Sequence, residues 1–408
     1  MSQLAKKLNF HFTDQTTYLE GFHRSGWAYV MQNLERLQDE NGIWCDTYVD
    51  RTFHWTAPNY IPYVRDWVGF VHHTFDTTFS DYNNVQLLKN PNFLESLTTC
   101  KGLFVFSKRQ MLKWRAQLNK RGFTAVVVTA LIHPTEFAEE KFTMTKFHEN
   151  EKRKLVQVGA WLRNNYAIYK LNNGKRYFRF ENDTVISKAA LIGPQMENYY
   201  KPLDFFRIFK RQQWKKHNIL PPNITYSSND ENGGLKTLAV TSIISINGEI
   251  PQAVVQETDH ADGMCRNIVC RDSDYALNKY VIGAMDLLKT YDDSVTIIST
   301  LENNDYDDLL SQNIVFLSLV DAAAINTLQE CIVRNTPIVV NKLPAVVEIL
   351  GEDYPLYYEN LDEISGLITL EKIADAYDYL YNMNKEKLTI DYFVNQIATS
   401  TLYQELAV

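Results

Sequence analysis

The chain has 408 residues, which is too long for one ordinary hydrophobic core and long enough for two domains of typical size. Its 41 Lys and Arg residues against 49 Asp and Glu residues give a net charge of −8. That charge argues against a nucleic-acid or anionic-membrane partner, because both need a concentrated basic surface. The 5 cysteines are odd in number and mostly scattered, which is typical of reduced thiols. No stretch approaches a membrane span, and Met1–Phe12 lacks the apolar core of a secretion signal, so we expect a soluble, cytoplasmic protein.

Short apolar, β-branched runs alternate with longer amphipathic segments in the first half of the chain. This alternation is typical of parallel α/β architecture, and the continuous apolar runs indicate a sheet that is covered on both faces. The expected strands are Leu8–Phe12, Trp44–Val49, Trp67–His72, Leu103–Phe106 and Thr124–Leu131. The expected helices are Trp27–Gln38, Asn92–Thr99 and Lys108–Lys120.

The pattern restarts after a charged stretch over residues 138–154, which we interpret as the connection between two α/β halves. The polar run Ser227–Gly234 is typical of a loop. Helices are expected over Leu388–Leu406. The second-half strands are expected at Lys154–Gly159, Leu235–Ile246, Val295–Ser299, Ile314–Leu317, Pro337–Val340 and Leu356–Tyr358. Two such halves place a ligand at the carboxyl ends of their strands.

The turn Asp321–Thr327 is the most informative, because it lies where an expected strand ends and an expected helix begins. Unpaired amides at a helix N-terminus attract an anion such as a diphosphate. Glu330 follows in the same helix, and a carboxylate beside an anion site suits hydroxyl donors such as those of a ribose. An ordinary helix start explains these residues equally well, with Asp321 or Asn326 as the cap and Glu330 complementing the helix dipole.

Glu330, the segment Asn335–Val340 and Glu348 together resemble the carboxyl-terminal half of the retaining GT-B glycosyltransferases, particularly the family-4-like group. The family's pattern is two spaced Glu residues, a small-residue helix, a Gly-Thr-Pro-Val-Val turn and strand, and a closing Glu. Glu330 matches the second Glu and Glu348 the closing acid. The first Glu falls on Ala322, and the nearest acid is Asp321, one position out of register. The resemblance therefore supports a ribose role for Glu330 more directly than a donor-sugar role for Asp321.

The resemblance extends to Arg153–Arg163, which is similar to the first strand and glycine turn of the family's second domain. The family's Arg directly after that glycine is replaced by Ala160, which leaves Arg163 as the guanidinium for a diphosphate. A surface arginine is the alternative. The resemblance implies catalytic roles for Asp321 and Arg163. The implied sugar-nucleotide site consists of Gly159, Arg163, Ile325, Asn326, Thr327 and Glu330.

Two segments of the first half also match positions that line the cleft of such enzymes. Gly21–Trp27 follows the first expected strand, as the family's glycine-bearing loop does. His72 and His73 match the histidines at a strand end beside the sugar, which makes them further catalytic candidates, with ordinary structural histidines as the alternative. Together with Asp76 they also suggest a metal, but GT-B enzymes need none for catalysis, so no metal and no cofactor are expected. The implied acceptor-binding residues are His23, Arg24, Ser25 and Gly26.

The resemblance implies a GT-B fold, in which two Rossmann-like domains with parallel sheets face a central cleft. The acceptor domain is expected over residues 1–145, completed by a C-terminal helix over about 386–408, and the donor domain over 150–385. The implied reaction moves a sugar from a nucleoside diphosphate sugar to a hydroxyl of a glycan or glycoconjugate, with retention of configuration.

Two alternatives remain open. One is a catalytically inactive, glycosyltransferase-like protein that binds a nucleotide or glycan. The other is a Rossmann-type dinucleotide enzyme, although neither Gly21–Gly26 nor Gly159–Arg163 has the Gly-x-Gly-x-x-Gly spacing that such an enzyme needs.

Overall fold

The computed structural model of the chain divides into two compact units. The first consists of Met1–Val156, Trp161–Arg163 and Leu301–Val408, and the second of Gln157–Ala160 and Asn164–Thr300. The structure describes residues 5–11, 26–54, 61–80, 82–159, 161–164, 167–171, 177–179, 185–191, 225–229, 235–244, 252–259, 265–269, 295–298 and 301–406. Among these residues, no helix is both long and apolar enough to cross a membrane.

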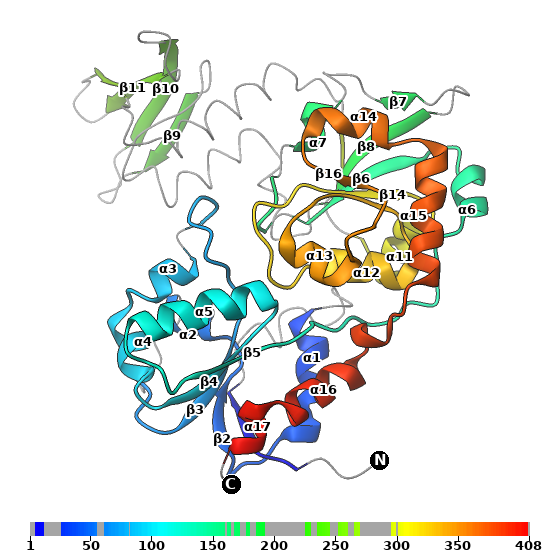
Figure 1. Ribbon diagram of the computed structural model, residues 1–408. Coiled ribbons are helices and arrows are strands. Elements are labelled where there is room, and N and C mark those ends of the chain that lie inside the picture. Colours follow the sequence, from blue (N-terminus) through cyan, green and yellow to red (C-terminus); the bar gives the residue numbers. More distant parts are fainter. Residues whose placement is uncertain are drawn as a thin grey trace. The chain divides into compact units, whose positions relative to one another are not determined.

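The first unit begins with a parallel five-stranded sheet, as the alternating pattern predicts (Figure 1). The strands are β1 (Leu8–His11), β2 (Ile43–Asp46), β3 (Trp67–Val71), β4 (Cys100–Val105) and β5 (Val127–Ala130). They lie in the order of the chain, β1-β2-β3-β4-β5. The prediction of a strand through Val49 is wrong, because helix α2 begins at that residue.

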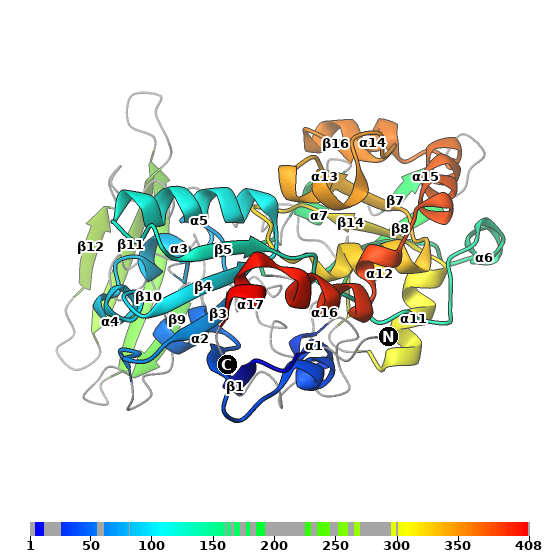
Figure 2. The ribbon, with the colours of Figure 1, turned by 60° about the horizontal axis from the view of Figure 1, so that its bottom comes forward.

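Helices cover both faces of this sheet, so its strands are apolar on both sides. One face packs against α1, α16 and α17, which Figure 2 shows together; α16 and α17 come from the C-terminal end of the chain. The other face packs against α2 to α5. The helices on the first face are α1 (Trp27–Leu34), η2 (Glu35–Leu37), α16 (Ile390–Thr399) and α17 (Thr401–Glu405). Those on the second are α2 (Val49–His54), α3 (Asn84–Leu87), α4 (Pro91–Ser96) and α5 (Lys108–Lys120). The predicted helices over Trp27–Gln38, Asn92–Thr99, Lys108–Lys120 and Leu388–Leu406 are thereby confirmed.

The rest of the first unit is a second parallel α/β layer, in which β14, β15 and β16 pair side by side. Its strands are β14 (Ile314–Leu317), β15 (Ile338–Asn341) and β16 (Tyr357–Tyr358). The first three residues of β6 (Lys154–Val158), up to Val156, also belong to this unit. Its helices are α6 (Met144–Glu149), α11 (Asn303–Ser311), α12 (Asn326–Arg334), α13 (Pro344–Leu350), η7 (Leu361–Glu363), α14 (Ile364–Leu367), α15 (Leu370–Asn382) and η8 (Glu386–Leu388). Two parallel α/β sheets confirm the predicted fold class.

The second unit contains the predicted strand β13 (Val295–Ile298), which pairs with β8 (Val185–Leu191), and the short elements α7 (Ala167–Lys170) and β7 (Tyr177–Arg179). It also contains an antiparallel sheet that the sequence did not predict as a sheet. That sheet has the order β12-β11-β10-β9, with bounds Cys265–Val269, Gln252–Asp259, Leu235–Ile244 and Thr225–Asn229. The polar-loop prediction for Ser227–Asn229 is wrong, because pairing with β10 overrides the low strand propensity of Ser and Asn.

A buried ion pair fixes helix α12 against α11 in the first unit. The Arg334 side chain, at the last residue of α12, is fully buried and donates from Nε and Nη2 to Asp307 Oδ1, at 3.1 and 2.7 Å. Its Nη1 donates to the Glu330 carbonyl at 3.0 Å. After Arg334 the chain turns at Asn335, whose φ of 60° and ψ of 24° end the helix in the left-handed conformation, and Pro337 then precedes β15.

We expect Arg334→Met to destabilise the protein by about 3–5 kcal/mol, because it leaves the Asp307 carboxylate buried without its cation. Urea denaturation followed by circular dichroism measures this loss. The double variant Arg334→Met/Asp307→Leu is the control and should lose clearly less, because it removes both charges. A single variant that loses less than about 1 kcal/mol contradicts the assignment.

Candidate functional site

The start of helix α12 carries no side-chain cap. Its N-cap residue is Ile325, which has no side-chain acceptor to offer to the first amides of the helix. Neither Asp321 nor Asn326 caps it, so the prediction of either residue as the cap is wrong; the Asp321 Oδ1 atom instead accepts a hydrogen bond from the amide of Ala322 at 2.9 Å. The positive end of the helix dipole is left without a neighbouring carboxylate cap.

Arg163 lies at this uncapped start. Its Nη2 donates to the Thr327 hydroxyl at 3.3 Å and its Nη1 to the Trp161 carbonyl at 2.6 Å. Backbone contacts hold the segment in place: the Val320 amide donates to the Leu162 carbonyl at 2.8 Å, and Arg163 forms an isolated bridge with Leu319. Arg163 is partly buried.

The loop between β14 and α12 is itself positioned by Asn341, at the end of β15. The Asn341 side chain accepts from the Leu319 amide at 2.8 Å and donates to the Leu319 carbonyl at 2.9 Å. These two bonds imitate one step of strand pairing and fix the path of the chain towards Ile325. Sequence reasoning missed Asn341, for which an amide side chain at the end of an apolar strand was the available signal.

Glu330 faces the interior of the first unit, with its side chain only 1% exposed. The Tyr306 hydroxyl of α11 donates to the Glu330 carboxylate. Burial, followed by the charge of Glu330, raises the pKa of Tyr306 well above its ordinary value, so Tyr306 remains a donor at any physiological pH. Next to Glu330, the Gln329 Nε2 atom donates to the His133 carbonyl at 2.8 Å, which ties α12 to the segment after β5.

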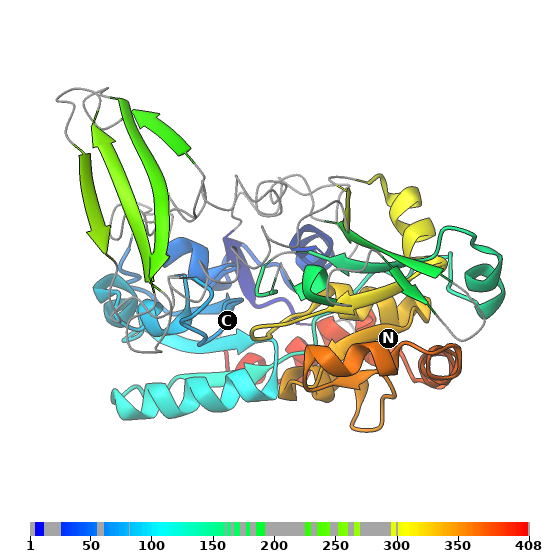
Figure 3. The ribbon, with the colours of Figure 1, turned by 90° about the horizontal axis from the view of Figure 1, so that it is seen from above.

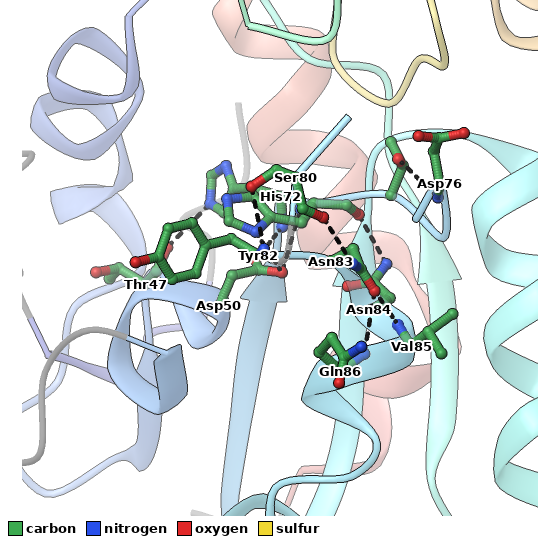
Figure 4. A network of polar contacts seen from close by, with 12 residues as sticks. Thr47, Asp50, His72, Asp76, Ser80, Tyr82, Asn83, Asn84, Val85 and Gln86 are labelled. Atoms are coloured by element: carbon green, nitrogen blue, oxygen red, sulfur yellow. Dashed lines mark hydrogen bonds and ion pairs between the residues drawn. The ribbon is translucent and has the colours of Figure 1, made fainter. Parts of the chain in front are cut away.

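The predicted histidines His72 and His73 follow β3, and Asp50 of α2 fixes their backbone (Figure 4). One Asp50 oxygen accepts from the His72 amide at 2.6 Å and the other from the His73 amide at 3.2 Å. Asn84 completes the arrangement by donating to the His73 carbonyl at 2.7 Å. Burial lowers the pKa of His72 well below its ordinary value, so its imidazole is neutral at pH 7.

The structure brings some of the predicted site residues together. The rings of His73 and Trp161 lie 5.4 Å apart, and the Trp161 carbonyl accepts from Arg163, which contacts Thr327. His72 lies instead between Trp27 and Tyr48, at ring distances of 4.5 and 4.0 Å. Trp161 and Asp50, which connect these groups, were not identified as site residues from the sequence.

The structure describes only part of the predicted acceptor segment. His23, Arg24 and Ser25 lie outside the described residues, and Gly26 is the N-cap residue of α1. Gly159 has a φ of 74°, a conformation that glycine adopts without strain. No group of His, Cys, Asp and Glu side chains among the described residues is arranged to hold a metal ion.

A buried carboxylate lies beside this site at the end of β2. Asp46 is 0% exposed, and it accepts from the Tyr48 amide at 2.9 Å and the Tyr63 hydroxyl at 3.0 Å. Burial raises the pKa of Asp46 from 3.8 to about 6, although these hydrogen bonds oppose the rise. His133, buried after β5, has its pKa lowered from 6.5 to about 4 by the same cause.

We expect Asp46 to make folding less favourable as the pH rises from 4 to 6. A pKa above its unfolded value means that the folded state binds the proton more tightly, so this stabilisation is complete below pH 4 and is lost through pH 6. A shift of this size corresponds to about 3 kcal/mol. His133 acts in the opposite direction over the same range, so the measurement is the wild-type free energy of unfolding minus that of Asp46→Asn. A difference that does not change with pH would contradict the assignment.

Comparison with known proteins gives structural likeness only. No protein-family model and no curated protein sequence matches the chain. A trehalose-6-phosphate structure from E. coli bound with UDP-2-fluoro glucose is 9% identical, with a TM-score of 0.47 over 97% of this chain and 84% of that chain. A UDP-forming α,α-trehalose-phosphate synthase from Burkholderia xenovorans is 7% identical, with a TM-score of 0.45 over 94% and 78%. A sucrose-phosphate synthase from Thermosynechococcus elongatus is 9% identical, with a TM-score of 0.44 over 89% and 73%. At these sequence identities and TM-scores, a function can be argued only from the residues of this chain.

Proposed function

We propose that the protein is a GT-B glycosyltransferase that moves a sugar from a nucleoside diphosphate sugar to an acceptor hydroxyl of a glycan or glycoconjugate. The observation that carries this proposal is the pairing of the Arg163 guanidinium with Thr327 at the start of α12, where no side chain caps the helix. Free helix amides and a guanidinium form together a site for a diphosphate.

In this proposal residues 150–385 bind the donor. Residues 1–145 bind the acceptor, and residues from about 386 to 408 complete that domain. The packing of α16 and α17 on the first sheet supports this division, because the apolar residues of both helices belong to the same core as β1 to β4. His23 to Gly26 would contact the acceptor, and Gly159 would allow close approach of the donor diphosphate.

The chemistry follows from where charge develops. Breaking the bond between the sugar and the diphosphate gives the sugar oxocarbenium character and places negative charge on the leaving group. Arg163 and the amides of Ile325, Asn326 and Thr327 would stabilise that charge. The neutral His72 would hydrogen-bond the sugar without adding a repelling cation, the adjacent His73 would also contact the sugar, and Asp321 would face the positive charge that the sugar develops. Retention of configuration and independence from metal belong to the same proposal.

Glu330 would accept hydrogen bonds from the ribose hydroxyls of the donor, with Tyr306 orienting its carboxylate. We expect Glu330→Ala to raise the nucleotide dissociation constant about 10- to 100-fold in calorimetry, because hydrogen bonds to a charged group are worth about 1.5–3 kcal/mol. Tyr306→Phe is the matched control: it removes the same internal hydrogen bond and keeps the carboxylate. Equal losses in both variants would assign Glu330 to the architecture of α12 instead.

We expect Arg163→Ala to lower the rate of donor turnover about 100-fold, since one preorganised donor to the leaving group contributes about that factor. The assay is release of nucleoside diphosphate from a panel of nucleotide sugars, with and without simple sugar acceptors. Arg36→Ala, which removes an exposed arginine paired with Asp391, is the control and should leave turnover unchanged. Nucleotide binding without turnover would identify a catalytically inactive binding protein, and absence of binding would refute the proposal.

A further inference from the structure

Helix α5 concentrates positive charge in a protein whose net charge is −8. The helix contains no Asp or Glu, and its C-cap residue is not acidic either. Its cations are Lys108, Arg109, Lys113, Arg115 and Lys120, and the C-cap residue Arg121 adds one more. The net charge of the whole chain does not reveal such a local concentration of positive charge.

Lys108, Arg109 and Lys120 are exposed on the side of α5 that faces away from the first sheet. Arg115 is also exposed, but its Nη2 atom donates to the Val128 carbonyl of β5 at 2.9 Å, and Lys113 lies 5.8 Å from the centre of the Phe75 ring. Gln110, Trp114 and Leu118 are the buried residues of α5, and their spacing by four places them on one side of the helix. The opposite side is therefore the outward one, and Figure 3 shows α5 along the outer edge of its layer. The exposed residues of the helix are Lys108, Arg109, Leu112, Arg115, Ala116, Asn119 and Lys120.

Leu112 lies in the middle of this outward side and is 62% exposed. Lys108 and Arg109 lie one turn before it, and Arg115 and Ala116 one turn after it, so cations flank an uncovered aliphatic side chain. We call the exposed residues Lys108, Arg109, Leu112, Arg115, Ala116 and Lys120 the α5 surface.

Ion pairs within the described part of the protein do not neutralise these charges. In the described part of the chain, none of the cations of α5 pairs with a side-chain carboxylate. Lys108 and Arg109 even lie at the positive end of the helix dipole, where cations are unfavourable. The Glu348 carboxylate compensates there, but it does so through the backbone amides of these two residues, at 2.8 and 3.0 Å. Their side chains remain exposed.

We propose that the α5 surface docks on a membrane that carries anionic lipid headgroups, a function that does not depend on sugar transfer. The cations supply charge complementarity to the headgroups. Leu112 favours a lipid surface over a nucleic acid, because an exposed aliphatic side chain between cations gains by entering the apolar region below the headgroups and gains nothing beside a phosphate backbone. The protein would lie on the membrane without crossing it.

The test is co-sedimentation of the full-length protein with vesicles of phosphatidylcholine, with or without phosphatidylglycerol, at low and high salt. We expect binding to the anionic vesicles only, with a loss of at least tenfold at high salt because surface charges are screened. Arg109→Gln/Lys120→Gln should weaken binding at least tenfold. Lys152→Gln/Lys387→Gln changes the net charge equally at exposed positions on other elements and should not weaken it.

The apolar contribution has its own pair of variants. Leu112→Ser should weaken vesicle binding at least threefold, whereas Tyr381→Ser, at an equally exposed position on α15, should have no effect. Circular dichroism confirms that each variant is folded. Absence of binding to anionic vesicles overturns the proposal, as does binding that the α5 variants leave unchanged. Binding to DNA or heparin that depends on Arg109 and Lys120 but not on Leu112, without binding to vesicles, would show a polyanion as the occupant and also overturn it.

Discussion

The burial of helix α12 is the constraint on which the candidate site depends. Every residue from Thr327 to Arg334 is buried, although Gln329, Glu330 and Arg334 are polar. Each of these needs a partner, since an unsatisfied buried polar group costs about 1–3 kcal/mol. Gln329 bonds to the His133 carbonyl, Glu330 accepts from Tyr306, and Arg334 bonds to Asp307. Because these partners come from different segments, the helix can neither rotate nor slide without breaking one of them.

This anchoring sets the chemistry of the helix start. A helix held so firmly at its middle and its end presents its first amides in a fixed direction, towards Arg163. The first turn needs no capping side chain to define its position, and no side chain caps its amides. Preorganisation of this kind is what an anion site requires, since dipoles that are already oriented do not have to be reorganised when charge develops.

Most of the fold of the first unit could be predicted from the sequence, because its strands are short runs of Val, Ile, Leu and Phe between amphipathic helices. The bounds of β14 agree with the prediction, and those of β5 and β15 differ from it only at their ends. The antiparallel sheet could not be predicted in the same way: Thr225–Asn229 contains Thr, Tyr, Ser and Asn, and it becomes a strand only through pairing with β10. Local composition does not contain that partner.

Candidate site residues could be selected from the sequence where they lie beside a turn or a helix start. They could not be selected where their role depends on contacts between distant segments. Arg163, Thr327 and Glu330 could be selected as candidates from the sequence because they lie next to a turn or in the helix that follows it; their roles stay predictions. Trp161, Tyr306 and Asn341 were missed because their roles come from segments that are distant in the chain. Asn341, for example, acts on Leu319 through both atoms of its amide, a contact between the ends of two neighbouring strands.

Glu348 shows why a matched residue does not by itself transfer a role. The resemblance identifies it with the acid that closes the family's motif. In this protein its carboxylate accepts from the Lys108 and Arg109 amides and completes the start of α5, where Ser107 supplies the next acceptor to Gln110. A carboxylate at this point is favourable whatever the protein binds, because it meets amides that would otherwise lack partners and the positive end of the helix. The position of Glu348 in the sequence is thus consistent with the family, while its contacts are explained by α5. A donor role for it would require those two hydrogen bonds to be given up.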